Sequence, residues 1–365
     1  MYRDHVPPAF AASVGDWVRI EAGSYVGYGL WDPDSPVALR IYSRQGVPDE
    51  RWVGDRIREA WQVRAAVRES GTTAFRWVNG EGDGMPGVVV DLYADYGVLV
   101  TYSAAVDSLV RSVANALRAT TRLKGVVQRS HTGMGALQVL AGRAPPTQLI
   151  VEENEIRMHV RLHDGQKTGL FLDQRENRRF VAQTANGRSV LNLFCYTGGF
   201  SLHAARAGAS RVTSVDAAAG AVAAARDNFA LNGIDPELHD FAAADAFEYL
   251  QQAYSDSLQF DLVISDPPSF ARTRGRRESA IRAYRRLHEL ALPVVRPFGL
   301  YAAASCTAQV SPEQFRATLS QAARRRRRRL QILHEASQPL DHPIMAGHPE
   351  GRYLKFVVGR VLPVC

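Results

Sequence analysis

The chain has 365 residues, 46% of them hydrophobic and 22% charged, which is the composition of an ordinary soluble globular protein long enough for two or three domains. Three cysteines without CxxC spacing argue against a disulfide framework or a cysteine-based zinc site, and the ten histidines form no HExxH motif. We therefore expect no metal. The sequence has neither an apolar run of membrane-spanning length nor a signal peptide, which predicts a cytoplasmic protein.

The formal charge of +7 suits a polyanionic partner, because each phosphate that a basic side chain neutralises releases condensed counterions. Nearly all of the positive charge is arginine, and lysine occurs only at Lys124, Lys167 and Lys355. A compositional bias of the source would produce the same charge without any selection for RNA. Charge alone therefore leaves both interpretations open.

Residues 1–70 are expected to form a small β-rich domain. Residues 14–41 alternate apolar and polar residues between Gly and Asp/Pro turns, which is typical of a few short strands. Apolar residues at helical spacing follow over residues 49–70. The pattern indicates a β-rich module closed by a helix.

Residues 71–165 are expected to form a central α+β domain. Strand candidates run from Val88 to Leu92 and from Val98 to Tyr102, and a helix is expected over residues 106–120. More strand candidates follow in the segments "GVVQRS", "ALQVLAG" and "EIRMHVRLHD". The order strand-strand-helix-strand-strand is plausible for a separate domain.

Residues 166–365 change to strands alternating with helices, which predicts an α/β domain with a parallel, doubly wound sheet and a ligand at the carboxyl ends of its strands. The expected helices cover residues 200–206, 218–231, 245–253, 278–293 and 312–329. The last of them includes the run from Arg324 to Arg329. We interpret this run as a solvated helix surface, because six successive residues point all round a helix.

A glycine pair follows the first strand of this α/β series. Gly198 and Gly199 allow a ligand to approach the backbone, and Asp216 ends the second strand, where its carboxylate can accept both hydroxyls of a ribose. Dinucleotide enzymes and S-adenosylmethionine-dependent methyltransferases share this arrangement. The GxGxxG spacing for a pyrophosphate is absent, so the turn favours S-adenosylmethionine over NAD or FAD, with a ligand-free structural turn as a third interpretation.

Two further strand ends agree with this cofactor. Asp245 follows the third strand, where a carboxylate can recognise the adenine amino group. Asp266, Pro267 and Pro268 follow the fourth strand. The prolines fix φ and remove amide donors, so they are expected to hold the Asp266 carboxylate in a rigid rim beside the transferred methyl group.

Six segments carry a resemblance to a known family: "QKTGLFLDQRENRR", "NLFCYTGGFSL", "TSVD", "DPPSF", "SCT" and "DHPIMAGHPEGRYLK". Over almost its whole length the chain resembles the bacterial 23S ribosomal RNA cytosine-C5 methyltransferases of the large-subunit methyltransferase I type. The resemblance implies an N-terminal PUA domain, a small β-barrel associated with RNA binding, then the central domain and a Rossmann-like methyltransferase domain. It also implies RNA as the partner, and we include a homodimer as a further expectation.

The resemblance also assigns residues to the cofactor site. The segment flanking the cofactor would include Lys167, Thr168, Phe171, Asp173, Gln174 and Arg175. The cofactor turn would include Phe194, Tyr196, Thr197, Gly198 and Gly199. Other interpretations remain: an ion pair of Asp173 with Arg175 that ties the domains together, and core packing of Phe171 and Tyr196.

The chain departs from the family pattern in two places. The basic stretch that precedes the first PUA strands in the family is missing, so the chain starts inside a longer natural protein or its PUA-like barrel is incomplete. The motif "SCT" stands where the family usually has Ser-Cys-Ser, which is a mild change.

Cys306 ends the fifth strand of the α/β series and is the candidate nucleophile. C5 of cytosine is a poor nucleophile, and addition of a thiolate to C6 makes an enamine whose C5 can accept a methyl group. Asp266 would hydrogen-bond the N3 and N4 edge of a flipped cytosine. An ordinary thiol has a pKa of about 8.5, so Cys306 needs a lowered pKa or a proton acceptor.

Other interpretations stay open. Cys306 is also compatible with a small buried hydrophobe, which is our interpretation of Cys195, and Cys365 has no inferred role. The same fold could methylate a nitrogen of guanine or adenine without a thiol. The chain could also be an RNA-binding or assembly protein without catalysis, or a small-molecule methyltransferase derived from the family.

Overall fold

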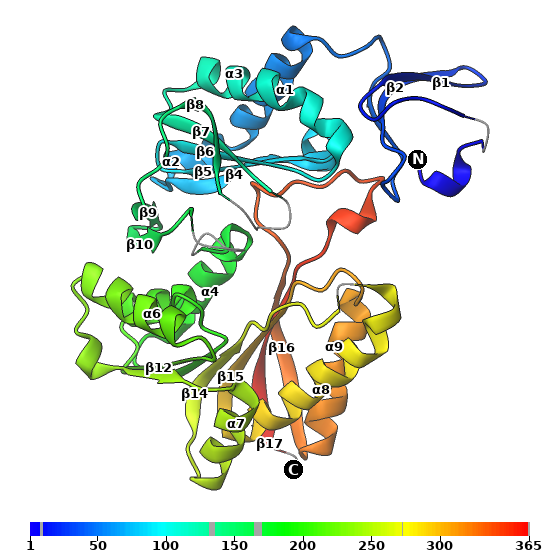
Figure 1. Ribbon diagram of the computed structural model, residues 1–365. Coiled ribbons are helices and arrows are strands. Elements are labelled where there is room, and N and C mark those ends of the chain that lie inside the picture. The colour runs from blue at the N-terminus through cyan, green and yellow to red at the C-terminus, as the bar shows by residue number, and fades with distance from the viewer. Residues whose placement is uncertain (8–9, 131–135, 164–169, 272, 364–365) are drawn as a thin grey trace. The chain divides into compact units, whose positions relative to one another are not determined.

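The computed structural model describes residues 1–7, 10–130, 136–163, 170–271 and 273–363 (Figure 1). The expected site residues Lys167 and Thr168 lie outside the described residues, as does Cys365. The chain divides into two compact units. Unit 1 comprises Met1–Glu155, Val160–Thr168 and Leu340–Gly351, and unit 2 comprises Ile156–His159, Gly169–Pro339 and Arg352–Cys365.

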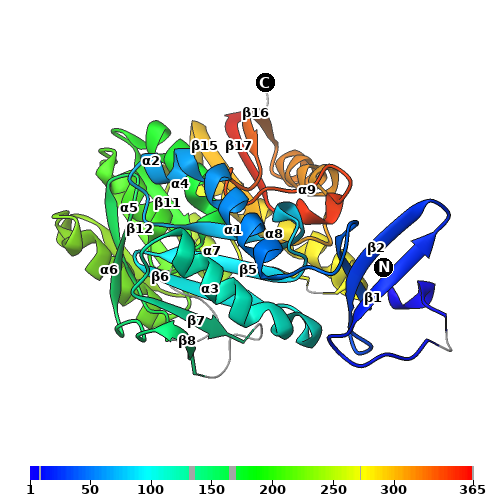
Figure 2. The same ribbon diagram turned by 90° about the horizontal axis from the view of Figure 1, so that it is seen from above.

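Unit 1 begins with a three-stranded antiparallel sheet, whose first two strands are labelled in Figure 2. The first elements of the chain are η1 (Arg3–His5), β1 (Trp17–Ala22), β2 (Tyr25–Trp31), β3 (Leu39–Ser43), α1 (Glu50–Val63) and α2 (Ala65–Glu69). The α1 helix starts where the Asp49 side chain accepts a hydrogen bond of 2.8 Å from Trp52 N, an N-cap that satisfies one of the helix's orphan amides. The short strands and closing helix agree with the expected β-rich module, and its assignment as a PUA domain stays a prediction.

The second sheet of unit 1 has five strands in the order β4-β5-β6-β7-β8. Its elements are β4 (Ala74–Asn79), η2 (Gly80–Asp83), β5 (Val88–Tyr93), β6 (Tyr96–Thr101), η3 (Ala104–Leu109), α3 (Val110–Thr120), β7 (Gly125–Arg129) and β8 (Gln138–Gly142). Neighbouring strands are antiparallel except β6 and β7, which the α3 crossover makes parallel. Strand β4 was not among the strand candidates of the sequence. Two more strands follow along the chain and form a separate sheet, β9 (Leu149–Glu153) and β10 (Ile156–Val160), and residues Ile156–His159 of β10 belong to unit 2.

The segment Leu340–Gly351 belongs to unit 1, and its residue Asp341 binds a buried arginine of that unit. Arg64 is fully buried, and its two terminal nitrogens bind the Asp83 carboxylate at 2.5 and 2.6 Å. The same guanidinium donates to Asp341 O at 2.8 Å, and Asp341 Oδ2 accepts from Arg76 N at 2.9 Å. The first half of the segment "DHPIMAGHPEGRYLK" is therefore held by hydrogen bonds inside unit 1.

Unit 2 is built on a seven-stranded sheet in the order β13-β12-β11-β14-β15-β17-β16. Its strands are β11 (Ser189–Leu193), β12 (Arg211–Asp216), β13 (Asp240–Ala243), β14 (Phe260–Ser265), β15 (Val295–Ser305), β16 (Arg328–Ala336) and β17 (Lys355–Pro363). The first five strands of the order pair in parallel, as the strand-helix alternation predicts. The chain moves outward from β11 to β13 and then resumes at β14 on the other side of β11. This reversal is the topological switch point at which open α/β sheets bind their ligands.

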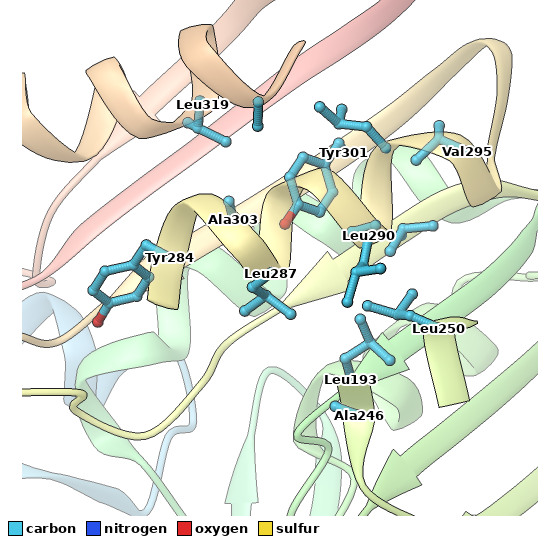
Figure 3. Packing of buried hydrophobic residues seen from close by; sticks show 14 of the residues in the cluster. Leu193, Ala246, Leu250, Tyr284, Leu287, Leu290, Val295, Tyr301, Ala303 and Leu319 are labelled. Carbon is cyan, nitrogen blue, oxygen red and sulfur yellow. The ribbon is translucent and has the colours of Figure 1, made fainter. Parts of the chain in front are cut away.

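Helices cover this sheet in two groups, α4, α5 and α6 in one and α7, α8 and α9 in the other (Figure 1). Their bounds are η4 (Leu172–Gln174), α4 (Arg175–Ala185), α5 (Gly199–Arg206), α6 (Ala219–Leu231), η5 (Pro236–Leu238), α7 (Ala246–Ser255), η6 (Arg274–Arg276), α8 (Arg277–Val294) and α9 (Pro312–Arg325), with η7 (Pro349–Gly351) in unit 1. Figure 3 shows Leu287 and Leu290 of α8 in the core with Tyr301 and Ala303 of β15.

The end of the sheet differs from the expectation in two ways. Strand β17 runs antiparallel to β15, and β16 runs antiparallel to β17, so the sheet is mixed rather than wholly parallel. The last helix ends at Arg325 instead of continuing to residue 329, and β16 starts at Arg328. Arg327 has a φ of 51°, which breaks the helix between these two elements.

The arginine run is therefore not one helix surface. Arg326 Nε donates to Glu289 O at 2.7 Å. This carbonyl is free because Pro293, four residues later in α8, has no N–H to donate. Arg325 binds the Glu289 carboxylate at 2.9 Å, while β16 forms the edge of the sheet, where charged side chains prevent pairing with another chain.

Candidate functional site

The turn after β11 is held in an unusual backbone conformation. Phe194 and Tyr196 have positive φ angles of 57° and 49°, and Gly198 has a φ of 82°. A Cβ atom at Gly198 would lie 2.8 Å from Ala225 Cβ of α6, so both the φ angle and the close approach require glycine. The turn thus brings the chain sharply from the strand into α5, as the glycine pair predicts.

Asp216, at the end of β12, organises this turn. Its Oδ2 atom accepts a hydrogen bond of 2.9 Å from Tyr196 N, and its Oδ1 atom accepts one of 2.9 Å from Ala218 N. A carboxylate oxygen can accept two hydrogen bonds, so each oxygen retains capacity for a ligand hydroxyl. The structure therefore brings together two residues that the sequence placed on neighbouring strand ends.

The third strand end presents another carboxylate. Asp245 is exposed and caps α7, and its Oδ1 accepts from Phe247 N at 2.8 Å and from Glu248 N at 3.1 Å. Its Oδ2 atom takes part in neither bond. Phe194 and Phe247 meet edge to face with their ring centroids 6.5 Å apart. The carboxyl ends of β11, β12 and β13 thus offer unused carboxylate acceptors and aromatic rings. This combination is suited to an adenosyl ligand.

Other residues of the expected cofactor set have partners inside unit 2. Gln174 is buried, and its Oε1 accepts from Asn177 Nδ2 at 2.5 Å. Thr197 O accepts from Asn228 Nδ2 of α6 at 2.9 Å, which ties the cofactor turn to that helix. The rings of Phe171 and Tyr196 are half-buried and meet edge to face at 5.5 Å. These bonds hold the turn in place, and no sequence motif had pointed to Asn228.

Asp173 and Arg175 were also expected near the cofactor, or as an ion pair with each other. Asp173 Oδ2 accepts a hydrogen bond of 2.7 Å from the hydroxyl of Tyr353. Tyr353 lies two residues before β17 begins at Lys355. Arg175 is buried and its Nε contacts Glu176 Oε1 at 3.1 Å. The described partners thus connect Asp173 to the start of β17.

The fourth and fifth strand ends lie next to each other. Strands β14 and β15 pair in parallel with Ser265 opposite Ala303, and Asp266 and Cys306 each follow directly after one of these strands. Asp266 and Cys306 are both half-buried, and Pro267 is buried. The two side chains proposed for chemistry therefore share one rim of the sheet.

The two residues that flank Cys306, Ser305 and Thr307, belong to a chain of hydrogen-bonded hydroxyl groups. Ser305 Oγ donates to the Tyr284 hydroxyl at 2.9 Å, which leaves the Tyr284 proton for Thr307 Oγ1 at 2.6 Å. Thr307 Oγ1 then donates to Ser269 Oγ at 3.2 Å, because the Ser269 proton is directed to Ala271 O. The chain connects the loop after β14, helix α8 and the end of β15.

Tyr284 stays neutral in this network. Burial raises the pKa of its hydroxyl to about 12, and the charges of Cys306 and Asp266 add to the rise. The hydroxyl therefore acts as a donor at neutral pH. Its position in α8 carries no sequence motif, and only the fold brings it to the strand end.

Lys355 is a further residue that sequence reasoning did not assign to the site. It is 4% exposed, and its Nζ donates to Thr307 O at 2.6 Å and to Tyr353 O at 2.8 Å. Burial lowers the pKa of this amine to about 8, and the charge of Cys306 acts in the opposite direction. One signal was present, because Lys355 is one of three lysines and stands in the quoted segment "RYLK".

Over the residues that the structure describes, no group of three His, Cys, Asp or Glu side chains could hold a metal ion. In the same residues, no helix has the length and apolar character needed to cross a membrane.

Comparisons with known proteins agree with the geometry. The family model for S-adenosylmethionine-dependent methyltransferases matches residues 98–342. A ribosomal RNA large subunit methyltransferase I from Shewanella denitrificans is 36% identical over 359 residues, which cover 95% of this chain and 90% of the relative. A ribosomal RNA large subunit methyltransferase from Deinococcus radiodurans is 40% identical over 350 residues, covering 91% of this chain and 85% of the relative.

A solved structure adds the cofactor. A methyltransferase crystallised in complex with SAH superposes with a TM-score of 0.83 at 28% identity, covering 92% of this chain and 88% of that chain. S-adenosylmethionine is the cofactor of this chain. The chain belongs to the family of S-adenosylmethionine-dependent methyltransferases.

Proposed function

We propose that the chain methylates C5 of a cytosine in large-subunit ribosomal RNA, through a covalent bond between Cys306 and C6 of the base. The names of the two relatives support ribosomal RNA as the substrate class. The observation that carries the carbon chemistry is the position of a half-buried cysteine at the end of β15, on the strand next to the one that ends in Asp266.

The reaction follows from what these residues can do. The Cys306 sulfur, as a thiolate, forms a bond to C6, and the electron pair of the C5–C6 double bond becomes available at C5. Asp266 holds the N3 and N4 edge of the flipped base and favours protonation of N3. S-adenosylmethionine supplies the electrophilic methyl group. After C5 has gained the methyl, a base removes the C5 proton, the C5–C6 double bond re-forms, and the sulfur leaves with its electron pair.

The proposed cofactor contacts come from the strand ends of unit 2. Asp216 would bind the ribose hydroxyls and Asp245 the adenine amino group. The proposed set as a whole is Gln174, Phe194, Tyr196, Thr197, Gly198, Asp216, Asp245, Asp266 and Pro267. The division into residues 1–70 for RNA binding, 71–165 as a central domain and 166–365 for methyl transfer belongs to the same proposal.

The test compares two cysteine variants, Cys306→Ala and Cys195→Ala, on 23S ribosomal RNA from cells that lack the protein. Methylated nucleosides are mapped by mass spectrometry. We expect 5-methylcytidine formation to fall by at least about 10³-fold in Cys306→Ala, because a nucleophile is lost, and to persist in Cys195→Ala.

Full activity of Cys306→Ala would contradict the proposal and favour methylation of a guanine or adenine nitrogen, for which no thiol is needed. Binding of SAH, measured by calorimetry, shows that each variant is folded. The absence of any lost 5-methylcytidine in cells without the protein would also overturn the proposal.

A further inference from the structure

The amino group of Lys355 is buried, and it has no acidic partner in the part of the chain that the structure describes. Among the described residues, no ion pair joins Lys355 to a carboxylate, and its two hydrogen bonds go to the neutral carbonyl groups of Thr307 and Tyr353. Buried charges in proteins are usually paired with an opposite charge, because desolvation otherwise costs several kcal/mol. The site therefore calls for an anion close to Lys355.

Cys306 is close enough to Lys355 for its charge to act on the amine. In the antiparallel pair of β15 and β17, Lys355 lies opposite Ser305, the residue before Cys306. Its hydrogen bond of 2.6 Å goes to the carbonyl of Thr307, the residue after Cys306. Lys355 thus contacts the chain on both sides of the cysteine, and an ammonium has three N–H bonds, of which these two hydrogen bonds use two.

We propose that Lys355 is a positioning residue that holds Cys306 as a thiolate, with the ammonium as the counter-cation of the sulfur. The inference rests on the proposed function, in which Cys306 is the nucleophile. In the step itself the S–H bond breaks, the proton passes to solvent and the electron pair stays on sulfur. Lys355 keeps all three of its protons throughout.

The other titratable groups described near Cys306 and Lys355 are negatively charged or neutral. Asp266, at the end of β14, carries a negative charge that acts on Tyr284, as does the charge of Cys306. The Tyr284 hydroxyl of α8 stays neutral, and the Asp173 carboxylate is bound by the hydroxyl of Tyr353. A thiolate beside the Asp266 carboxylate is therefore stabilised by a positive charge.

The ionisation state of Lys355 is compatible with this role. Burial lowers the pKa of Lys355 to about 8, so most molecules carry the ammonium at pH 7. The negative charge of Cys306 raises the pKa of Lys355, which means that formation of the thiolate strengthens the ammonium. The two ionised groups stabilise each other.

A structural role is the competing explanation, because Lys355 also ties the end of β15 to the start of β17. Two replacements separate charge from hydrogen bonding. Lys355→Gln keeps an N–H donor for the carbonyls and removes the charge, whereas Lys355→Arg keeps the charge. Lys124→Gln is the matched control, since Lys124 is half exposed and pairs with Asp95.

The experiment measures the pH dependence of Cys306 alkylation by iodoacetamide in the full-length protein, with peptide mass spectrometry to identify the modified cysteine. We expect the wild-type midpoint to lie below about 8.5, the value of an ordinary thiol. Lys355→Gln should raise the midpoint by about one unit or more, and Lys355→Arg should stay closer to the wild type. The Lys124→Gln midpoint should not move.

A wild-type midpoint at or above about 8.5 overturns the inference even if no Lys355 variant folds. An unchanged midpoint in Lys355→Gln, with SAH binding retained, overturns it as well. Either result, combined with loss of methylation in Cys306→Ala, leaves the proposed function standing. A shifted midpoint combined with full methylation by Cys306→Ala would instead contradict the proposed function alone.

Discussion

The carboxyl ends of β11 and β15 each carry a cysteine, and their surroundings differ in the sign of the nearby charge. Cys195, after β11, is 5% exposed, and burial together with the negative charge of Asp216 raises the pKa of its thiol. Cys306, after β15, is half-buried and lies beside the buried amine of Lys355. We therefore expect the two thiols to differ in reactivity, because thiol reactivity depends on stabilisation of the thiolate.

The largest expected difference between the two strand ends is in covalent chemistry. With RNA that contains 5-fluorocytosine, the C5 fluorine cannot leave as a proton does, so the bond between sulfur and C6 should persist. We expect the trapped peptide to contain Cys306 and not Cys195, as mass spectrometry of the digested complex would show. Trapping at Cys195, or the absence of trapping by protein that is active on unmodified RNA, would contradict the expected difference between the two cysteines.

Cofactor binding should depend on Asp216 at the end of β12, which holds the turn after β11. Asp216→Asn removes the charge and one acceptor from a carboxylate that binds Tyr196 N and Ala218 N. Hydrogen bonds to charged groups contribute about 1.5–3 kcal/mol, so we expect affinity for SAH to fall by about 10- to 100-fold in calorimetry. Asp227→Asn, at an exposed position of α6, is the control and should bind normally. Equal affinity of both variants would remove Asp216 from the site.

The backbone of the cofactor turn should be sensitive to a single methyl group. Gly198→Ala combines a positive φ of 82° with a clash of 2.8 Å against Ala225, and we expect the free energy of unfolding to fall by about 1–3 kcal/mol. Gly187→Ala has a similar φ of 70° with no atom within 4 Å of the added Cβ. Urea denaturation should therefore show a smaller loss at residue 187, and equal losses would mean that the close approach to α6 costs nothing.

The smallest effect is expected in the hydroxyl chain at the β15 end. Tyr284→Phe removes the partner of two fully buried hydroxyls, Ser305 Oγ and Thr307 Oγ1. We expect a loss of about 1–2 kcal/mol in the free energy of unfolding, since each buried hydroxyl loses one hydrogen bond. Tyr254→Phe, on an exposed ring, should leave stability unchanged. A stable Tyr284→Phe protein would show that the chain of hydroxyls is dispensable.

Much of the arrangement could be predicted from local sequence signals. Asp245 ends a strand and caps a helix, Ser311 and Gln314 form a capping box at the start of α9, and glycine occurs where φ is positive at residue 198. These signals act within a few residues, so the helices from α5 to α8 appear close to their expected bounds. Strand β16 was missed because it starts with arginines, which do not contribute to an apolar pattern. A strand at the edge of a sheet can carry such charged side chains.

Gly198, Asp216, Asp245 and Asp266 each follow a strand of an alternating α/β series, so the sequence was sufficient to predict that they meet at the switch point. The side chains near Cys306 could not be predicted in this way, because folding brings them together. Tyr284 lies in α8, 21 residues before Ser305, and Lys355 comes from a strand that returns antiparallel beside β15. Their distance along the chain leaves no spacing to recognise, whereas hydrogen bonding and burial at the strand end define their environment.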